Sequence, residues 1–454
     1  MTGPTRVGVV GAGYVGLTTA ACLAHLGHRV ICADVDVEKV AGLSRGEVPI
    51  REEGLAPLVA EGLAAGRLSF ALGAAGAAAA DIVFLCVPSP QGDDGHADLS
   101  AVREVAAEVG PVLRAGATVV NKSTLPVGST RLVGRLLAEA GAAPRRFTVV
   151  CNPEFLREGS AVRDFLRPHR IVVGCDTPGR AEPVVELYRD VPAPVLVLGC
   201  ASAEMVKYAA NAFLATKVSF VNEVAALCEA VGADVRDVAG GIGLDPRIGP
   251  EFLRPGPGYG GSCLPKDVAA LLATAQMVGC DLGVLRAVAE TNTRQRDRIV
   301  AKIRRAAGGR LTGASVAVWG LTFKAGTDDL RDSPALAVVA RLLAEGATVR
   351  AYDPAAPVGA GRSIAGLPAA TTVTMTDPYS ACTGADVLAI LTDWEEFRWV
   401  DFGRVRALLG RPALVDARNL LDPAALAGFR YEGVGRPRAA EGAESPRRLL
   451  EAAS

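Results

Sequence analysis

RVGVVGAGYVG, residues 6–16, is an apolar run that leads into three glycines spaced as GxGxxG. A helix-compatible stretch at 17–27 and a second apolar run at 29–34 follow it directly. A strand, a glycine turn, a helix and a strand within about 30 residues form the βαβ unit of a parallel sheet. We therefore expect an α/β fold built on a parallel sheet.

The glycine turn also indicates a dinucleotide site. Gly11 permits the tight turn, Gly13 lets a pyrophosphate approach the backbone, and Gly16 lets the helix pack on the strand. Asp34 ends the next strand, 18 residues after Gly16, where a carboxylate accepts hydrogen bonds from both ribose hydroxyls. Since that carboxylate would repel a 2′-phosphate, NAD is favoured over NADP. The alternative is a chance glycine turn beside a surface aspartate.

Further apolar runs, continuous as in buried parallel strands, recur along the chain. They span residues 81–88, 117–124, 147–154, 314–320, 347–353, 385–392 and 412–419. Between the two series, residues 202–232 have the pattern of one long helix, and helical sequence continues to about Gly308. We expect two Rossmann-like doubly wound parallel-sheet domains joined by a long central helix and a helical middle region. The second series has no GxGxxG, so we do not expect it to bind the cofactor equally.

Composition excludes several classes of protein. The chain has 454 residues, of which 50% are hydrophobic and 21% charged, which is too apolar for disorder and enough for two or three domains. A net charge of −1 gives no reason to expect nucleic acid or a membrane surface as a partner. Val7–His28 has no Asp, Glu, Lys or Arg, but its five glycines argue against a membrane span. Ten cysteines lie singly, without metal-type spacing, so we expect no metal and a reducing cytoplasm.

Cys263 differs from the other cysteines in its surroundings. It lies in the glycine loop GYGGSCLPKD, residues 258–267, just before a predicted helix. A helix N-terminus and the ammonium of Lys266 both favour a thiolate, and flanking glycines would let a substrate approach closely. These residues alone leave a nucleophile and a buried structural cysteine equally open.

Other chemically suggestive residues lie on the long helix and after predicted strands. Glu204, Lys207 and Asn211 share one helix face, where the lysine and asparagine would suit an oxyanion; the alternative is a paired or solvated lysine. Residues 122–128 and 152–158 each follow the carboxyl end of a strand, where open α/β sheets bind ligands, although a helix cap would also explain the acids. Lys324 and Arg331 follow a strand of the second series and would suit phosphate or carboxylate.

Eight sequence strings then occur in a recognisable order. They are GAGYVGL (11–17), PIREEGLAPLV (49–59), KSTLPVGST (122–130), CNPEFLREGSA (151–161), KYAANAF (207–213), DPRIG (245–249), GPGYGGSCLPKD (256–267) and GLTFKAGTDDLRDSPAL (320–336). Together they resemble the UDP-glucose/GDP-mannose dehydrogenase family over residues 5–435. The resemblance implies an enzyme in which two NAD molecules in succession oxidise the C6 alcohol of a nucleotide sugar to a carboxylate.

The resemblance also implies catalytic roles. Cys263 matches the nucleophile that forms a thiohemiacetal and then a thioester, and Lys207 and Asn211 match the groups that stabilise oxygen charge. Thr124 and Asp267 match the pair that holds a water, and Glu154 matches the acid implicated in thioester hydrolysis.

Binding positions follow from the same resemblance. Those near NAD are Gly11, Gly13, Tyr14, Val15, Gly16, Asp34, Lys39, Ser89, Thr124, Glu158, Lys266 and Arg331. Those near the nucleotide sugar are Glu154, Phe155, Leu156, Lys207, Asn211, Arg247, Tyr259, Gly260, Lys324 and Arg418. Ser89 stands where many relatives carry Thr, and it keeps a hydroxyl.

The resemblance further implies a domain plan and a homodimer or larger assembly. The expected domains are an NAD-binding domain at 1–201, a central helical dimerisation domain at 202–310 and a nucleotide-sugar-binding domain at 311–435. Residues 436–454 lie beyond the resemblance, and because they mix Arg, Glu, Ala and Pro without a period we expect them to form a mobile tail. In the family, the residue matching Arg247 reaches the partner subunit's site.

The substrate and class alternatives stay open. UDP-glucose, oxidised to UDP-glucuronate, is favoured because Ser262 stands where UDP-N-acetylhexosamine enzymes usually carry His, and because the strings at 245–249 and 256–261 look more like the UDP-glucose branch. GDP-mannose is the alternative, since its dehydrogenases share GGSCLPKD. A non-catalytic nucleotide-sugar-binding protein is a third, disfavoured because Cys263 and Lys207 are both present.

Overall fold

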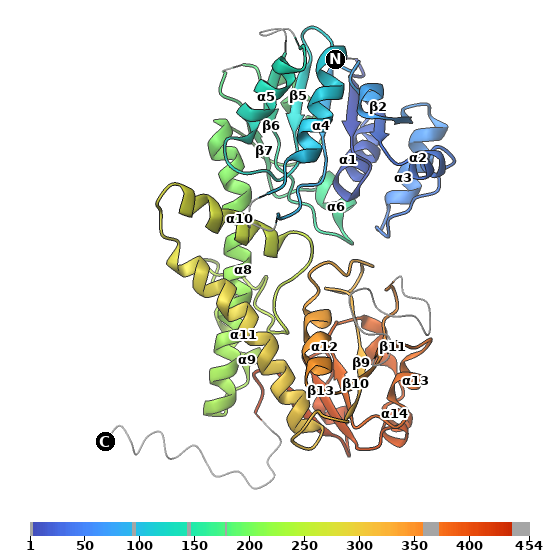
Figure 1. The fold of residues 1–454 in the computed structure, drawn as a ribbon, viewed down its shortest axis with the longest axis vertical. Coiled ribbons are helices and arrows are strands. Elements are labelled where there is room, and N and C mark those ends of the chain that lie inside the picture. The colour runs from blue at the N-terminus through green and yellow to red at the C-terminus, as the bar shows by residue number, and fades with distance from the viewer. Residues whose placement is uncertain (1–2, 93–96, 143–146, 178, 357–371, 438–454) are drawn as a thin grey trace. The chain divides into compact units, whose positions relative to one another are not determined.

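The computed structural model describes residues 3–92, 97–142, 147–177, 179–356 and 372–437 (Figure 1). The chain forms two compact units: a first unit of residues 1–210 and 269–281, and a second unit of residues 211–268 and 282–454. The predicted long helix is present as α8 (Cys200–Val231), drawn in green in Figure 1, and its residues divide between the two units. The three-domain boundaries drawn from the sequence stay a prediction.

The first unit contains an eight-stranded sheet in the order β3-β2-β1-β4-β5-β6-β7-β8. Its strands are β1 (Arg6–Val10), β2 (Arg29–Asp34), β3 (Leu68–Leu72), β4 (Ile82–Leu85), β5 (Thr118–Asn121), β6 (Thr148–Cys151), β7 (Ile171–Gly174) and β8 (Val195–Leu198). Neighbouring strands are parallel except β6 and β7, which meet antiparallel at Cys151 and Gly174. Strand order reverses beside β1, so the ends of β1 and β4 flank the crevice where open sheets bind ligands.

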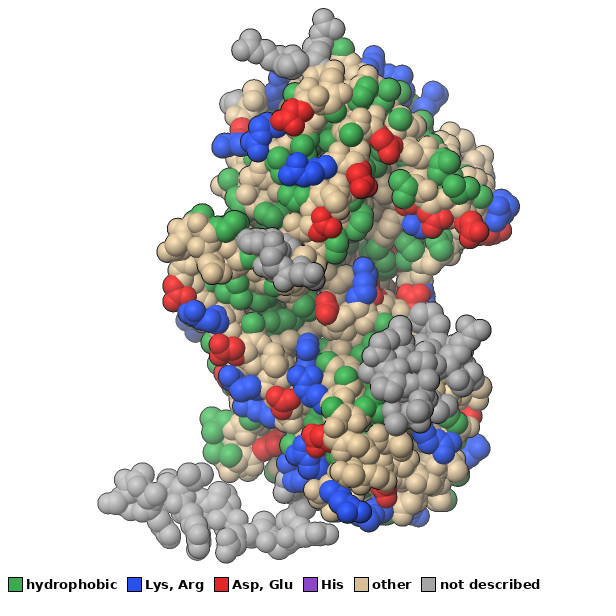
Figure 2. All heavy atoms as spheres, viewed as in Figure 1, with side chains coloured by type: hydrophobic (Ala, Val, Ile, Leu, Met, Phe, Trp, Pro, Cys, Tyr) green, Lys and Arg blue, Asp and Glu red, His purple; other side chains and the backbone are tan. Residues whose placement is uncertain are grey.

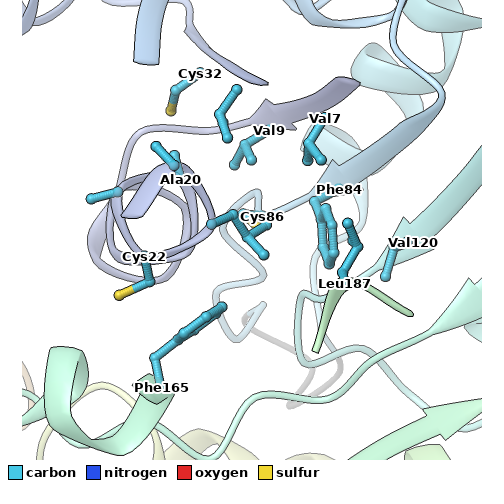
Figure 3. Close-up of a cluster of buried hydrophobic side chains, with 14 of the residues drawn as sticks. Val7, Val9, Ala20, Cys22, Cys32, Phe84, Cys86, Val120, Phe165 and Leu187 are labelled. Carbon is cyan, nitrogen blue, oxygen red and sulfur yellow. The ribbon is translucent and has the colours of Figure 1, made fainter. Parts of the chain in front are cut away.

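Helices cover this sheet, and α1, which begins directly after the glycine turn, has nine buried residues. They are α1 (Tyr14–His25), α2 (Val37–Ser44), α3 (Leu55–Ala64), α4 (Ser100–Val109), α5 (Ser129–Glu139), α6 (Ala161–Leu166) and α7 (Glu182–Leu187). Cys22 of α1 packs in a cluster with Cys86, Val9 and Phe165 (Figure 3). Burial raises the pKa of Cys22 to about 12, as expected for a cysteine that serves as a small apolar side chain.

The second unit contains a six-stranded parallel sheet in the order β11-β10-β9-β12-β13-β14. Its strands are β9 (Ser315–Trp319), β10 (Thr348–Tyr352), β11 (Thr372–Thr374), β12 (Val387–Ile390), β13 (Ala413–Asp416) and β14 (Arg430–Gly433). The remaining helices are α9 (Val235–Gly243), α10 (Leu264–Met277), α11 (Gly283–Ala306), α12 (Pro334–Ala344), α13 (Pro378–Cys382) and α14 (Phe402–Leu408). The predicted fold class, two Rossmann-like sheets with a helical middle, is confirmed.

Four further observations concern a membrane span, surface charge, metal-type clusters and the tail. Val7–His28 divides into β1, the glycine turn and α1, and no described helix is long and apolar enough to cross a membrane. Basic and acidic side chains are interspersed on the face shown in Figure 2. Within the described residues, no group of His, Cys, Asp and Glu is arranged to hold a metal ion. Of the predicted tail, residues 438–454 lie outside the described residues.

Candidate active site

The glycine turn after β1 has one glycine with unfilled space beside it. Gly11 has φ +97°, and a Cβ there would lie 2.5 Å from the Cys86 carbonyl oxygen. A Cβ on Gly16 would collide with the Gly11 carbonyl oxygen, so the protein's own packing requires both glycines. A Cβ on Gly13 would meet no protein atom within 4 Å. Gly13, which precedes Tyr14 and Val15 of α1, therefore leaves backbone accessible to a phosphate at a helix N-terminus.

Asp34 is held at the end of β2 facing the same turn. Its Oδ2 accepts from the Ala12 N–H at 2.8 Å and from Lys39 Nζ at 3.3 Å, and its Oδ1 accepts from the Asp36 N–H. Burial would raise the pKa of Asp34, but the two backbone N–H groups and the Lys39 charge hold that pKa below its ordinary value. A fixed, ionised carboxylate beside an open glycine turn fits the ribose and pyrophosphate of NAD.

The other residues predicted near NAD in this unit follow the ends of strands β4, β5 and β6. Ser89 Oγ donates to the Thr124 carbonyl oxygen at 2.8 Å, which joins the loops after β4 and β5. The Tyr14 hydroxyl accepts from the Gly159 N–H, directly after the half-buried Glu158. The structure thus joins the loops of Ser89 and Thr124 and, separately, joins Tyr14 at the start of α1 to the loop that carries Glu158.

Glu154 and Lys207, predicted to be catalytic, form a buried ion pair in the first unit. Lys207 Nζ lies 2.8 Å from Glu154 Oε1, and both side chains are at most 6% exposed. The second carboxylate oxygen accepts from the Leu156 N–H at 2.7 Å. Burial would raise the pKa of Glu154, but Lys207 and that N–H hold it below its ordinary value, so the carboxylate is ionised. The guanidinium of Arg170 lies over the Phe155 ring, with its Cζ atom 3.7 Å from the ring centre.

Two buried glutamates that were not predicted as site residues hold loops that carry predicted ones. Glu204 accepts from the Gly128 N–H at 2.6 Å and from the Thr130 N–H at 2.8 Å, at the start of α5. Glu52 accepts from the Gly159 and Ala161 N–H groups, each at 2.7 Å. Both carboxylates satisfy backbone N–H groups at helix N-termini, which is a positioning role. Glu52 lies in the string PIREEG, the sequence feature that could have indicated it.

In the second unit, Asn211 and Asp267 are hydrogen-bonded to each other. Asn211 Nδ2 donates to Asp267 Oδ2 at 2.6 Å, and Lys266 Nζ donates to Oδ1 at 2.6 Å. Asp267 is 1% exposed, and its carboxylate is therefore buried. Its two partners are the Lys266 ammonium and the Asn211 amide. Three predicted residues are thereby brought together at the start of α10.

Cys263 directly precedes α10 and is half-buried, with the Ser262 hydroxyl 3.5 Å from its sulfur. Two of its flanking glycines are required by packing, and whether they also let a substrate approach stays a prediction. A Cβ on Gly260 would collide with the Asp332 carbonyl oxygen, and one on Gly261 would lie 2.7 Å from the Phe323 ring. These glycines are needed because the loop packs against residues 323–334.

The remaining predicted substrate and cofactor residues of the second unit lie around the ends of its strands or on its surface. Arg418, after β13, donates to the Leu391 and Phe323 carbonyl oxygens at 2.9 and 3.0 Å, and Lys324 Nζ lies 5.5 Å from the Phe323 ring centre. Arg331 pairs with Asp329, and Arg247, 87% exposed, pairs with Asp245. Tyr259 is buried.

A Rossmann sheet with an open glycine turn and an ionised carboxylate at the end of β2 is the arrangement with which NAD-dependent dehydrogenases bind their cofactor. Models of the UDP-glucose/GDP-mannose dehydrogenase family match three segments: the NAD binding domain at residues 5–192, the central domain at 201–294 and the UDP binding domain at 317–423. The chain belongs to this family, its cofactor is NAD, and it is a nucleotide-sugar 6-dehydrogenase.

Individual relatives are similar to this chain over nearly its whole length. UDP-glucose 6-dehydrogenase of Pseudomonas aeruginosa is 47% identical, covering 96% of this chain and 98% of its own length. UDP-glucose 6-dehydrogenase of Rhizobium meliloti is 47% identical, covering 95% and 100%. The structure of a UDP-glucose dehydrogenase from Pyrobaculum islandicum superposes with a TM-score of 0.87 at 38% identity, covering 95% and 98%.

Proposed function

We propose that this protein oxidises the C6 alcohol of UDP-glucose to the carboxylate of UDP-glucuronate. The balanced reaction consumes one sugar nucleotide, two NAD⁺ and one water, and it releases two NADH and three protons. The observation that carries the proposal is Cys263, a half-buried thiol at the start of α10 in a chain 47% identical to UDP-glucose 6-dehydrogenases. A dehydrogenase that stopped at the aldehyde would have no use for a nucleophile.

UDP-glucose is proposed over other nucleotide sugars on two grounds. The relatives with 47% identity are named for UDP-glucose, and Ser262 rather than His precedes Cys263. GDP-mannose remains the competing substrate in the test below.

The proposed chemistry places a covalent intermediate on Cys263. NAD held at the glycine turn after β1 and by Asp34 would supply the hydride acceptor for each oxidation at C6. The thiolate of Cys263 adds to the aldehyde carbon, forming a C–S bond while the oxygen gains a proton, and the resulting thiohemiacetal cannot leave between the oxidations. Loss of the second hydride and of the hydroxyl proton gives a thioester. Water then attacks its carbonyl carbon, the C–S bond breaks, and the thiolate returns.

The buried polar groups have matching proposed roles. Glu154 is ionised beside Lys207, so it can accept the proton of the hydrolytic water but cannot act as the proton donor at neutral pH. Lys207 and Asn211, one helical turn apart on α8, are proposed to stabilise charge on the C6 oxygen. Thr124 and Asp267 are proposed to hold the water that takes up the alcohol proton.

We also propose a homodimer or larger assembly of this chain, working in the cytoplasm. Phe213, Phe220 and Leu227 lie seven residues apart on α8, and each is more than half exposed. That spacing puts three large apolar side chains on one helix face, as at a helix–helix interface. Sedimentation velocity tests the assembly: a monomer at micromolar concentration would contradict it.

The function is tested by following NADH at 340 nm with UDP-glucose, GDP-mannose and UDP-N-acetylglucosamine in separate reactions. We expect UDP-glucose to give the highest kcat/KM by at least about tenfold, since a misplaced sugar or base leaves buried polar groups unpaired. Cys263→Ser should stop steady-state turnover while UDP-glucose still binds by calorimetry. Faster turnover of GDP-mannose would overturn the substrate, and an active Cys263→Ser variant would overturn the covalent route.

A further inference from the structure

The loop that carries Cys263 is held by three buried amide side chains that no sequence motif indicated. Asn222 of α8 accepts from the Gly256 N–H at 2.9 Å, and Gln295 of α11 donates to the Gly256 carbonyl oxygen at 2.8 Å. Asn292 of α11 accepts from the Tyr259 N–H at 2.8 Å and donates to the Tyr259 carbonyl oxygen at 3.1 Å. The two helices thus hold the loop at two points before Cys263.

Asn292 makes the most specific of these contacts. Its amide pairs with both main-chain polar groups of one residue, as a neighbouring strand would, and it supplies both hydrogen bonds recorded for the Tyr259 main chain. The side chain is 5% exposed, so loss of the amide would leave a buried N–H and a buried C=O without partners. Gly258, at φ +113°, has no room for a Cβ beside Asn292 Oδ1.

The loop is also fixed after Tyr259. Gly260 and Gly261 pack against the Asp332 carbonyl oxygen and the Phe323 ring, and two residues later Cys263 meets the first residue of α10. The backbone between Tyr259, which Asn292 holds, and the start of α10 is therefore short and tightly packed. A shift at Tyr259 passes directly to the position of the Cys263 sulfur, for which small displacements from the reacting carbon have large kinetic effects.

We propose that Asn292 is a positioning residue that sets the place of Cys263 through the Tyr259 main chain, with Gln295 assisting at Gly256. The catalytic part of this inference rests on the proposed function of Cys263. The structural part, control of the thiol's accessibility by Asn292, does not.

The test compares three near-isosteric variants that differ in the number of hydrogen bonds lost from the loop. Asn292→Leu removes two, Gln295→Met removes one, and Thr291→Val removes none, because Thr291 donates to Glu223 on α8 instead. Thr291→Val is the matched control for losing a buried polar group from the same turn of α11. Thermal unfolding midpoints of all three variants identify any that fail to fold.

The first readout is alkylation of Cys263 by iodoacetamide, followed by peptide mass spectrometry with the exposed Cys280 as the internal reference. We expect the Cys263 rate, relative to Cys280, to rise several-fold in Asn292→Leu, less in Gln295→Met and not in Thr291→Val. This measurement needs no turnover, so it decides the positioning role even if UDP-glucose is not the substrate.

The second readout is steady-state kinetics with UDP-glucose. Asn292→Leu should lower kcat by about tenfold to a hundredfold and leave the KM for NAD within about twofold, whereas Thr291→Val should change neither. Equal alkylation and kcat in Asn292→Leu and the wild type would overturn the proposal. So would losses in Thr291→Val as large as those in Asn292→Leu, because they would show a general effect of weakening α11.

Discussion

The turns after β1 and β9 are built alike, although we expect only the first to bind NAD. Each strand has five residues and is followed directly by a glycine with positive φ, +97° at Gly11 and +91° at Gly320. In each, an aspartate at the end of the neighbouring strand accepts from the N–H that follows this glycine. Asp34 accepts from Ala12 at 2.8 Å, and Asp353 accepts from Leu321 at 2.7 Å.

The two turns differ in how far the protein's own groups occupy the space and the hydrogen-bonding capacity beside the glycine. Thr322 stands where the first turn has Gly13, and its N–H and hydroxyl both donate to Asp353. Asp353 also accepts from the Trp394 indole and from the N–H groups of Ala355 and Ala356, so its oxygens are fully used. Asp34 accepts from three groups, and Gly13 leaves open space. The same backbone therefore leaves open space for a ligand at Gly13 in the first turn, whereas Thr322 takes that position in the second.

Among the variants that test this difference between the two turns, Gly13→Val should have the largest effect, on the affinity for NAD. A side chain at 13 meets no protein atom but occupies the space we assign to the pyrophosphate, so the fold should persist while NAD affinity falls. We expect the Kd for NAD to rise about 100-fold, equivalent to roughly 2.8 kcal/mol, by isothermal titration. Thr322→Val is the control, with NAD affinity unchanged. Wild-type NAD affinity in Gly13→Val would contradict the assignment.

Asp353→Asn should show that the second carboxylate is structural. Its removal exchanges charge-assisted acceptors for an amide that cannot accept from all the same donors, which should lower the free energy of unfolding by about 2 kcal/mol. Urea denaturation measures this, and the Kd for NAD should not change. A variant as stable as the wild type would mean that the two aspartates are not used differently.

Asp34→Asn should have the opposite profile. Loss of the carboxylate weakens the bonds to the ribose hydroxyls and removes repulsion of a 2′-phosphate, so NAD should bind about tenfold more weakly, roughly 1.4 kcal/mol. Discrimination against NADP should narrow, as measured by titration with both dinucleotides. Unchanged discrimination would count against Asp34 as the ribose ligand.

A smaller effect is expected in the pH dependence of stability. The folded pKa of Asp34 lies below its ordinary value, so its stabilising contribution is complete above the unfolded pKa of about 3.9 and is lost as pH falls through the folded pKa. The stability difference between the wild type and Asp34→Asn should be constant at pH 5–8 and narrow at lower pH. A difference that widens on acidification would show the wrong sign.

Local patterns predicted the strands that carry the site, and they failed where the pattern is short or the contact is distant. β1 and β2 were found because a glycine turn and an acid mark them, whereas β7 and β14, four residues each, carry no such mark. The role of Cys263 could be hypothesised from its loop. The contacts of Asn292 and Glu204 could not be predicted, because these side chains meet their loops across 33 and at least 74 residues. No local pattern indicates which distant amide or carboxylate will meet a given backbone. The same limit explains why the packing of Gly260 against Asp332, which is equally remote in sequence, could not be predicted.

Oxidation of one sugar nucleotide by two equivalents of NAD, which the proposed route through Cys263 requires, can be tested by an end-point count of NADH. Limiting UDP-glucose is incubated with excess NAD and enzyme, and NADH is measured at 340 nm after the reaction stops. We expect two NADH for each UDP-glucose consumed. One NADH for each UDP-glucose, with free aldehyde in solution, would contradict it.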